Sequence, residues 1–232
     1  MKPQPMSQEV PSWETENLVS RVRHDLLQPA AAMKLLLSRL DELTSQDEVR
    51  SLAKILNRSV AELDETVQRI ADHMMLVHGS VESSPAPLNI RAWMNEEAPT
   101  FADRAKAAGL DFHIDVPDTT VTTDAALLSR VVGELLDNAI DFTQTGSVSL
   151  IVGTDPAFQI SVCDTGIGLP TSLVQVLMKP YFTEQAEKSR RQNRLGIGLP
   201  RAELAAALLG GTVTLQPNTS GQGTMAIATL SC

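Results

Sequence analysis

The chain has 232 residues, of which 43% are hydrophobic and 3% aromatic, and its formal net charge at pH 7 is −9. This size and apolar fraction allow one or two domains with buried cores and exclude a wholly disordered chain. The acidic balance and the few aromatic residues argue against a nucleic-acid-binding protein, and no apolar run is long enough to span a bilayer.

The sequence from residue 16 to residue 78 has the periodicity of two long helices that follow a short N-terminal tail, residues 1–15. In the first helix, apolar seam positions recur at steps of three and four: Leu18, Val22, Leu26, Pro29, Met33, Leu36, Leu40 and Leu43. The second seam has nearly the same spacing: Val49, Leu52, Leu56, Ser59, Leu63, Val67, Ile70, Met74 and Val77. A turn around residues 44–47 offers N-capping residues for the second helix. Apolar residues off the seams, such as Leu27 and Leu35, predict that two copies of this hairpin form a four-helix bundle.

The remainder of the chain is predicted to form a separate domain. A Pro- and Ser-rich stretch at residues 79–87 indicates a linker, and residues 88–232 follow it. We expect helices and strands in the order helix 90–108, strands 111–116 and 120–123, helix 124–142, strands 147–153 and 157–163, helix 199–209, and strands 211–216 and 223–230. This order lacks a strict βαβ rhythm and predicts a mixed sheet covered by helices on one face. The expected fold class is therefore α+β, with a helical hairpin followed by an α/β sandwich.

His24 lies on the first predicted helix, two residues from both Val22 and Leu26. Two helical steps turn by about 200°, so the imidazole points away from the apolar seam. A neutral imidazole is a usable nucleophile at neutral pH, and Asp25 can accept one ring N–H and fix the tautomer. Gln28 shares the face of His24 and could orient a water molecule. The simpler interpretation is a polar residue on a solvated helix face.

Two segments of the second domain carry oxygen atoms suited to a nucleotide. Glu134 and Asn138 lie four residues apart in a predicted helix and share a face, where their oxygens could bind a hard cation beside phosphate oxygens. Asp164 follows an apolar strand, and a carboxylate at a strand end can accept a hydrogen bond from the exocyclic amine of a base.

Glycine pairs adjoin these segments. Gly166 and Gly168 follow Asp164 and let backbone approach a ligand, whereas Gly196 and Gly198 open a predicted helix whose free N–H groups suit phosphates. Each segment alone is equally typical of an ordinary turn. Their order and spacing together indicate a nucleotide-binding domain.

These motifs resemble those of the catalytic core of a bacterial sensor histidine kinase. Residues 24–29 resemble the phosphoacceptor box of that family, residues 134–139 its N box, and residues 179–183 its F box. Residues 164–168 and 196–199 resemble its two glycine boxes. The resemblance implies a dimerising helical hairpin followed by an ATP-binding sandwich of the Bergerat type.

The resemblance also implies roles for matching residues. His24 would be phosphorylated on a ring nitrogen, and Asp25 would orient it and take its proton. Asn138 would coordinate Mg²⁺, and Asp164 would bind the adenine of ATP. Gln28 occupies the position of the phosphatase residue of the family, where Thr or Asn is more usual. The nucleotide pocket and its lid would be formed by Gly166, Gly168, Phe182, Gly196, Gly198 and Leu199.

Two departures from the family pattern leave alternatives open. Asp141 stands where a phosphate-contacting Lys or Arg is common, so the charge would come from a basic cluster formed by Lys188, Arg190, Arg191 and Arg194. Glu134 replaces the more familiar Asn, and in related gyrase-like and chaperone-like ATPases a Glu there activates water. An ATP hydrolase, a kinase acting on another residue, or a phosphotransferase without kinase activity therefore remain alternatives.

The resemblance implies several binding partners. They are ATP, Mg²⁺, a second copy of the chain, and a response-regulator receiver domain whose aspartate takes the phosphoryl group. A polar N-terminus and only two cysteines, Cys163 and Cys232, predict a cytoplasmic protein with no membrane segment in this chain. No nucleic acid is expected among its partners.

Overall fold

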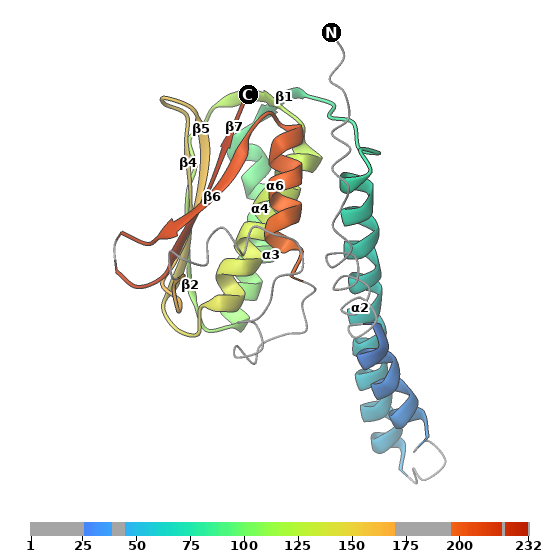
Figure 1. Cartoon of the computed structure of the whole chain (residues 1–232). Helices are drawn as coiled ribbons and strands as arrows, with labels where there is room; N and C mark the ends of the chain where they lie inside the picture. Colours follow the sequence, from blue (N-terminus) through green and yellow to red (C-terminus); the bar gives the residue numbers. More distant parts are fainter. Residues whose placement is uncertain (1–25, 39–44, 170–195, 220, 232) are drawn as a thin grey trace. The chain divides into compact units, whose positions relative to one another are not determined.

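The computed structural model describes residues 26–38, 45–169, 196–219 and 221–231 (Figure 1). They divide into two compact units, the first extending to Met74 and the second beginning at Met75. In the first unit, residues 26–37 are α-helical, and they lie within the first predicted helix. The other residues of that predicted helix lie outside the described ranges.

The second predicted helix is observed as α2 (Gln46–Val77), which has 32 residues. It begins with a capping box, because the Ser45 hydroxyl accepts a hydrogen bond from the Glu48 backbone N–H at 3.2 Å and the Glu48 carboxylate accepts one from the Ser45 N–H at 3.1 Å. These two bonds confirm that the turn around residues 44–47 caps the second helix.

The buried face of α2 differs from the predicted seam near its C-terminal end. Met74 and Val77 are 38% and 47% exposed, whereas His73 and Leu76 are buried. The seam prediction is therefore wrong at these positions. It took a step of four after Ile70, but burial follows a step of three, and the helical repeat of 3.6 residues allows either. The predicted seam residues Val49 and Val67 are exposed as well, and so are Ile55, Val60 and Met75, which lie off the seam.

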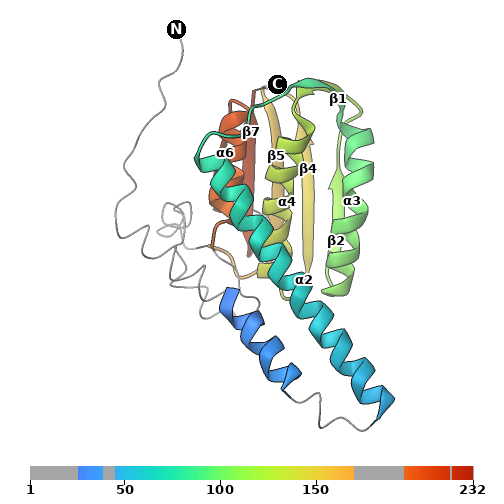
Figure 2. The same ribbon diagram turned by 90° about the vertical axis from the view of Figure 1, so that its right-hand side faces the viewer.

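The second unit contains a five-stranded sheet in the order β2–β4–β5–β7–β6, with three helices on one of its faces (Figures 1 and 2). β2 and β4 are parallel and all the other pairs are antiparallel. The strands are β2 (Asp111–Asp115), β4 (Ser147–Gly153), β5 (Phe158–Asp164), β6 (Thr212–Pro217) and β7 (Thr224–Leu230). The helices are α3 (Ile90–Ala107), α4 (Ala125–Phe142) and α6 (Gly198–Leu208). The predicted mixed sheet and α+β class are thus confirmed.

The predicted ends of these helices and strands differ from the observed ones by at most one residue. One strand was not predicted. β1 (Ala86–Asn89) pairs with β3 (Thr120–Thr123) in a separate two-stranded sheet and includes Ala86 and Pro87, which we assigned to the linker. That assignment is wrong for these two residues. A proline lacks the N–H that a central strand needs, but it is tolerated in an edge strand such as β1.

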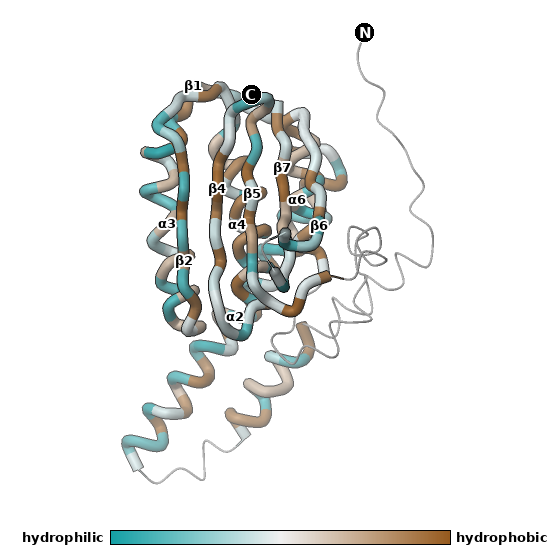
Figure 3. Tube along the Cα trace, turned by 90° about the vertical axis from the view of Figure 1, so that its left-hand side faces the viewer, coloured by the Kyte–Doolittle hydropathy of each residue, from teal (hydrophilic) through white to brown (hydrophobic). Residues whose placement is uncertain are grey.

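The core of the second unit lies between the helices and the sheet. Burial alternates along β4 and β5, so that Val148, Leu150, Ile160 and Val162 face the core. Figure 3 shows hydrophobic stretches along both strands. α4 contributes the largest share of fully buried residues and is covered by apolar neighbours. Within the described ranges, no helix has both the length and the apolar character required to cross a membrane.

Asp124 fixes the start of α4, the helix that carries Glu134 and Asn138. Its Oδ1 atom accepts hydrogen bonds from the N–H groups of Ala126 and Leu127 at 2.9 and 3.1 Å, and its Oδ2 atom accepts one from Ser84 at 2.7 Å. Burial acts to raise the pKa of this carboxyl group, but the three backbone donors hold the pKa below its ordinary value. Asp124 therefore caps α4 and attaches the preceding segment to it.

We predict that Asp124→Ala lowers the free energy of unfolding at pH 7 by about 1–2 kcal/mol, because the cap is lost. The stabilisation by a carboxylate with a lowered pKa is complete above the unfolded-state pKa, about 3.9, and is lost as the pH falls through the folded-state pKa. Denaturant titrations should therefore show the difference from wild type shrinking below about pH 4. The exposed Asp115 provides a control, and Asp115→Ala should leave stability unchanged. A difference that stays constant into acid would contradict the role of the ionised group.

Candidate functional site

Three of the predicted site residues meet where α6 begins against α4. A Cβ atom placed on Gly198, the first residue of α6, would lie 2.8 Å from Glu134 Oε2 and 3.6 Å from Asn138 Oδ1. Only glycine allows such a close approach of the α6 backbone to the polar side chains of α4. Glu134 and Asn138 share one face of α4, as predicted, and this face meets the N-terminus of α6.

Asn138 has a buried amide nitrogen, Nδ2, without a hydrogen-bond partner among the described residues. A buried donor that remains unpaired costs about 1–3 kcal/mol. A polar ligand that approaches the start of α6 would remove this cost. The amide of Asn138 is therefore suited to hold a bound group at this position.

The N-terminus of α6 is suited to an anion. Its N-cap residue, Ile197, forms no side-chain capping bond, and Pro200 in the first turn has no N–H to satisfy. Gly196, just before the helix, has a φ of +66°, a conformation that favours glycine. The half-buried Leu199 packs against the core and helps to fix this turn. The first N–H groups of α6, which receive no capping side chain from Ile197, can thus bind phosphate oxygens.

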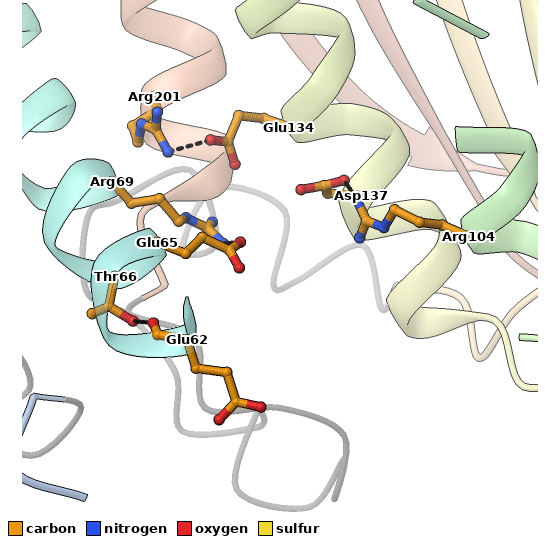
Figure 4. A network of polar contacts seen from close by, with 8 residues as sticks. All are labelled: Glu62, Glu65, Thr66, Arg69, Arg104, Glu134, Asp137 and Arg201. Atoms are coloured by element: carbon orange, nitrogen blue, oxygen red, sulfur yellow. Dashed lines mark hydrogen bonds and ion pairs between the residues drawn. The ribbon is translucent and has the colours of Figure 1, made fainter. Parts of the chain in front are cut away.

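Glu134 forms an ion pair with Arg201 of α6 (Figure 4). Arg201 Nη1 lies 2.5 Å from Glu134 Oε1, and the two side chains are 6% and 8% exposed. A buried carboxylate requires such compensation, because removing a charge from water costs several kcal/mol. The sequence analysis did not identify Arg201, although an arginine three residues after Gly198 in an otherwise Ala- and Leu-rich helix was a detectable signal.

Asp164 ends β5 and has one oxygen atom engaged and one available. Its Oδ1 atom accepts hydrogen bonds from the N–H groups of Gly166 at 2.8 Å and of Thr224 at 3.1 Å. Its Oδ2 atom accepts none from the residues that the structure describes. Burial raises the pKa of Asp164 despite these two bonds. The side chain thus presents a single oriented oxygen acceptor at a buried position.

The loop that follows Asp164 packs on the C-terminal end of α4. A Cβ atom on Gly166 would collide with the carbonyl oxygen of Phe142, and the Ile167 N–H donates to the same oxygen at 3.4 Å. The side chains of Phe142 and Ile167 are 40% and 57% exposed. These exposed apolar side chains close to Asp164 can pack against a planar base, and the sequence analysis missed Phe142.

A second ion pair joins α4 to α3 next to Asn138. Arg104 of α3 contacts the carboxylate of Asp137 (Figure 4). Gly168 has a φ of +71° and faces the backbone of Gly223.

The described residues contain no group of three or more His, Cys, Asp or Glu side chains that could hold a metal ion by themselves. A divalent cation at Asn138 would therefore need ligand oxygens as well.

Other predicted residues cannot be placed at this site. His24, Asp25, Phe182 and Arg194 lie outside the described residues, as do the other members of the basic cluster. Gln28 is exposed on the helix of residues 26–37, in the first unit. The roles predicted for these residues remain predictions.

Comparison with known proteins defines the class of this domain. Residues 123–232 match the family described as Histidine kinase-, DNA gyrase B-, and HSP90-like ATPase. The chain is 27% identical over 229 residues to the sensor histidine kinase AtsR of Burkholderia thailandensis, covering 90% of this chain and 36% of that protein. The chain thus spans little more than a third of the length of this relative.

Solved structures show the same fold. The Acinetobacter baumannii histidine kinase AdeS superposes with a TM-score of 0.70 at 20% identity, over 90% of this chain and 97% of that one. The histidine kinase ThkA, solved in complex with the response regulator protein TrrA, has a TM-score of 0.68 at 19% identity, over 91% of this chain and 60% of that one. Residues 123–232 of the second unit thus match a model of the ATPase family, and the chain as a whole resembles the catalytic core of a sensor histidine kinase.

We predict that Arg201→Met lowers the free energy of unfolding by about 3 kcal/mol, because the buried Glu134 carboxylate loses its guanidinium partner. The double variant Glu134→Leu/Arg201→Met should recover most of this loss, since no charge is left buried. Denaturant titrations without nucleotide measure both effects. If the double variant loses as much free energy of unfolding as Glu134→Leu and Arg201→Met lose together, the two charges do not compensate each other.

Proposed function

We propose that this protein is an ATP-dependent, homodimeric protein-histidine kinase of a two-component system, located in the cytoplasm. ATP would phosphorylate His24, and the phosphoryl group would pass to an aspartate of a response-regulator receiver domain. The observation that carries this proposal is the grouping of Glu134, Asn138 and Gly198 at the start of α6, in a domain that matches an ATPase family.

Recognition of the base is assigned to Asp164. Its available Oδ2 atom would accept a hydrogen bond from the exocyclic amine of adenine, and Phe142 and Ile167 would pack against the ring. A buried acceptor discriminates strongly, because a base without a donor leaves it unpaired. Gly166 and Gly168 would let the backbone approach the nucleotide closely.

The phosphates and Mg²⁺ are assigned to the start of α6. Its uncapped N–H groups would bind phosphate oxygens, with Gly196 and Leu199 shaping the turn. Asn138 would give its amide oxygen to Mg²⁺ beside the phosphates, and its unpaired Nδ2 atom would donate to a phosphate oxygen. Glu134 would be a second oxygen ligand from α4. Bound Mg²⁺ would supply neutralisation of the phosphate charge, while Phe182 and Arg194 would complete the site.

The first unit would supply the acceptor of the phosphoryl group. His24 would attack through its ring nitrogen while Asp25 takes its proton, and Gln28 would support later hydrolysis by orienting a water molecule. The exposed apolar residues of α2 support pairing of two hairpins into a bundle. The structure of ThkA with its response regulator supports a receiver domain as the partner.

An ATP hydrolase is the alternative, with Glu134 as the base that activates water. The ion pair with Arg201 engages the Oε1 atom of Glu134 in this alternative and in its proposed role as a Mg²⁺ ligand, so it does not separate the two. A base must in addition lie within hydrogen-bond reach of a water in line with the phosphate. A phosphotransferase that has lost kinase activity would not require the nucleotide-binding residues of the second unit.

We predict that the full chain, incubated with Mg²⁺ and γ-labelled ATP, acquires a phosphoryl label that is stable in base and lost in acid. His24→Ala should abolish the label, because the proposed acid-labile, base-stable P–N bond forms on the imidazole nitrogen of His24. Gel analysis of acid- and base-treated samples measures the label directly.

Two variants serve as controls for this labelling. His78→Ala removes an exposed histidine of the same part of the chain and should leave the label unchanged. Asp164→Asn should prevent labelling by weakening nucleotide binding. Label that survives in His24→Ala would refute the assignment of the acceptor. Phosphate release that persists without His24 and is lost in Glu134→Gln would favour the hydrolase.

A further inference from the structure

Asn218 lies in the loop between β6 and β7 and contacts the backbone of Asp164. Its Nδ2 atom donates a hydrogen bond to the carbonyl oxygen of Asp164 at 2.8 Å, and its backbone N–H donates to Gly223 at 3.1 Å. The residue is only 9% exposed. Asn218 thus connects the loop to the end of β5, 54 residues earlier in the chain.

The same loop also contacts the side chain of Asp164. The Thr224 N–H donates to the Oδ1 atom, and a Cβ atom on Gly223 would collide with the carbonyl oxygen of Asp164. Gly223 has a φ of +126°, which only glycine adopts readily. The β6–β7 loop therefore holds Asp164 at its main chain and at one carboxylate oxygen.

We propose that Asn218 is a positioning residue that makes the site selective for nucleotides whose purine carries a 6-amino group. This inference rests on the proposed function of Asp164 as the base-recognising residue. Asn218 itself need not touch the nucleotide. It acts through Asp164, by fixing the backbone from which the carboxylate projects.

The selectivity follows because the two carboxylate oxygens of Asp164 have different partners. Gly166 and Thr224 occupy Oδ1, so the orientation of Oδ2 depends on where these two donors and the Asp164 backbone lie. A 6-amino group gains a hydrogen bond from a fixed acceptor. A 6-oxo group presents an acceptor to an acceptor and gains nothing. If the backbone of Asp164 shifts, only the aminopurine loses a contact.

Asn218→Asp is the sharpest test, because it keeps the size of the side chain and replaces the donor NH₂ group by an acceptor. We would measure the affinities of the full-length chain for ATP and for inosine triphosphate, which has a 6-oxo group, by competition with a fluorescent nucleotide. The affinity for ATP should fall about tenfold, equivalent to about 1.4 kcal/mol. The affinity for inosine triphosphate should change less than twofold.

A double-variant cycle shows whether Asn218 acts through Asp164. Asp164→Asn alone should remove the preference for ATP, and adding Asn218→Asp to it should cause no further loss of ATP affinity. Thr219→Ala changes the exposed neighbouring residue of the same loop and should preserve the preference. If Asn218→Asp does not fold, as judged by its thermal unfolding, Asn218→Ala replaces it in every arm.

The outcomes separate this inference from the proposed function. A wild-type chain that shows no preference for ATP over inosine triphosphate contradicts base recognition by Asp164 and overturns both. A preference that persists in Asn218→Asp overturns the role of Asn218 alone. Equal weakening of both nucleotides also overturns it, because a purely structural contribution to the site does not distinguish the two bases.

Discussion

The burial of the Asp164 carboxylate is the constraint on which the proposed nucleotide site depends. Burial raises the pKa of this group in the folded protein. Ionisation of the buried group therefore lowers the free energy of unfolding, increasingly so as the pH rises from the ordinary aspartate pKa toward the raised one. Two backbone donors offset part of that cost on Oδ1. The fold thereby keeps an acceptor at a buried position, where a hydrogen bond to a ligand is worth more than at the surface.

Helix α4 also holds polar groups at buried positions, because it combines a buried apolar face with polar side chains directed at α6. Gly198 lets α6 begin within contact of these side chains, and Arg201 compensates the charge of Glu134. Among the described residues, Asn138 Nδ2 has no hydrogen-bond partner. The proposed nucleotide would supply a partner for this buried donor. In this account, packing and ligand binding are coupled through one helix.

The sequence predicted the elements of the second unit closely, because alternating and helical patterns are local properties of the chain. Motifs with fixed spacing also singled out Asp164, Asn138 and Gly198, and their roles remain predictions. Arg201 and Asn218 were missed because their partners lie 67 and 54 residues away. Arg201 stands out locally in an Ala- and Leu-rich helix, but no local pattern identifies Glu134 as its partner. β1 was missed because Pro87 is typical of a linker, and only its pairing with β3 reveals a strand. At the end of α2, the helical repeat permitted two faces, and only tertiary packing selected between them.

The central claim is that Asp164 Oδ2 is the acceptor for the amine of a bound adenine. The most direct test is a crystal structure of the chain with Mg²⁺ and a non-hydrolysable ATP analogue. We expect the 6-amino nitrogen within about 3 Å of Asp164 Oδ2, with the Gly166 and Thr224 bonds to Oδ1 unchanged and the phosphates at the start of α6. A base bound elsewhere, with Oδ2 facing only water, would contradict the account.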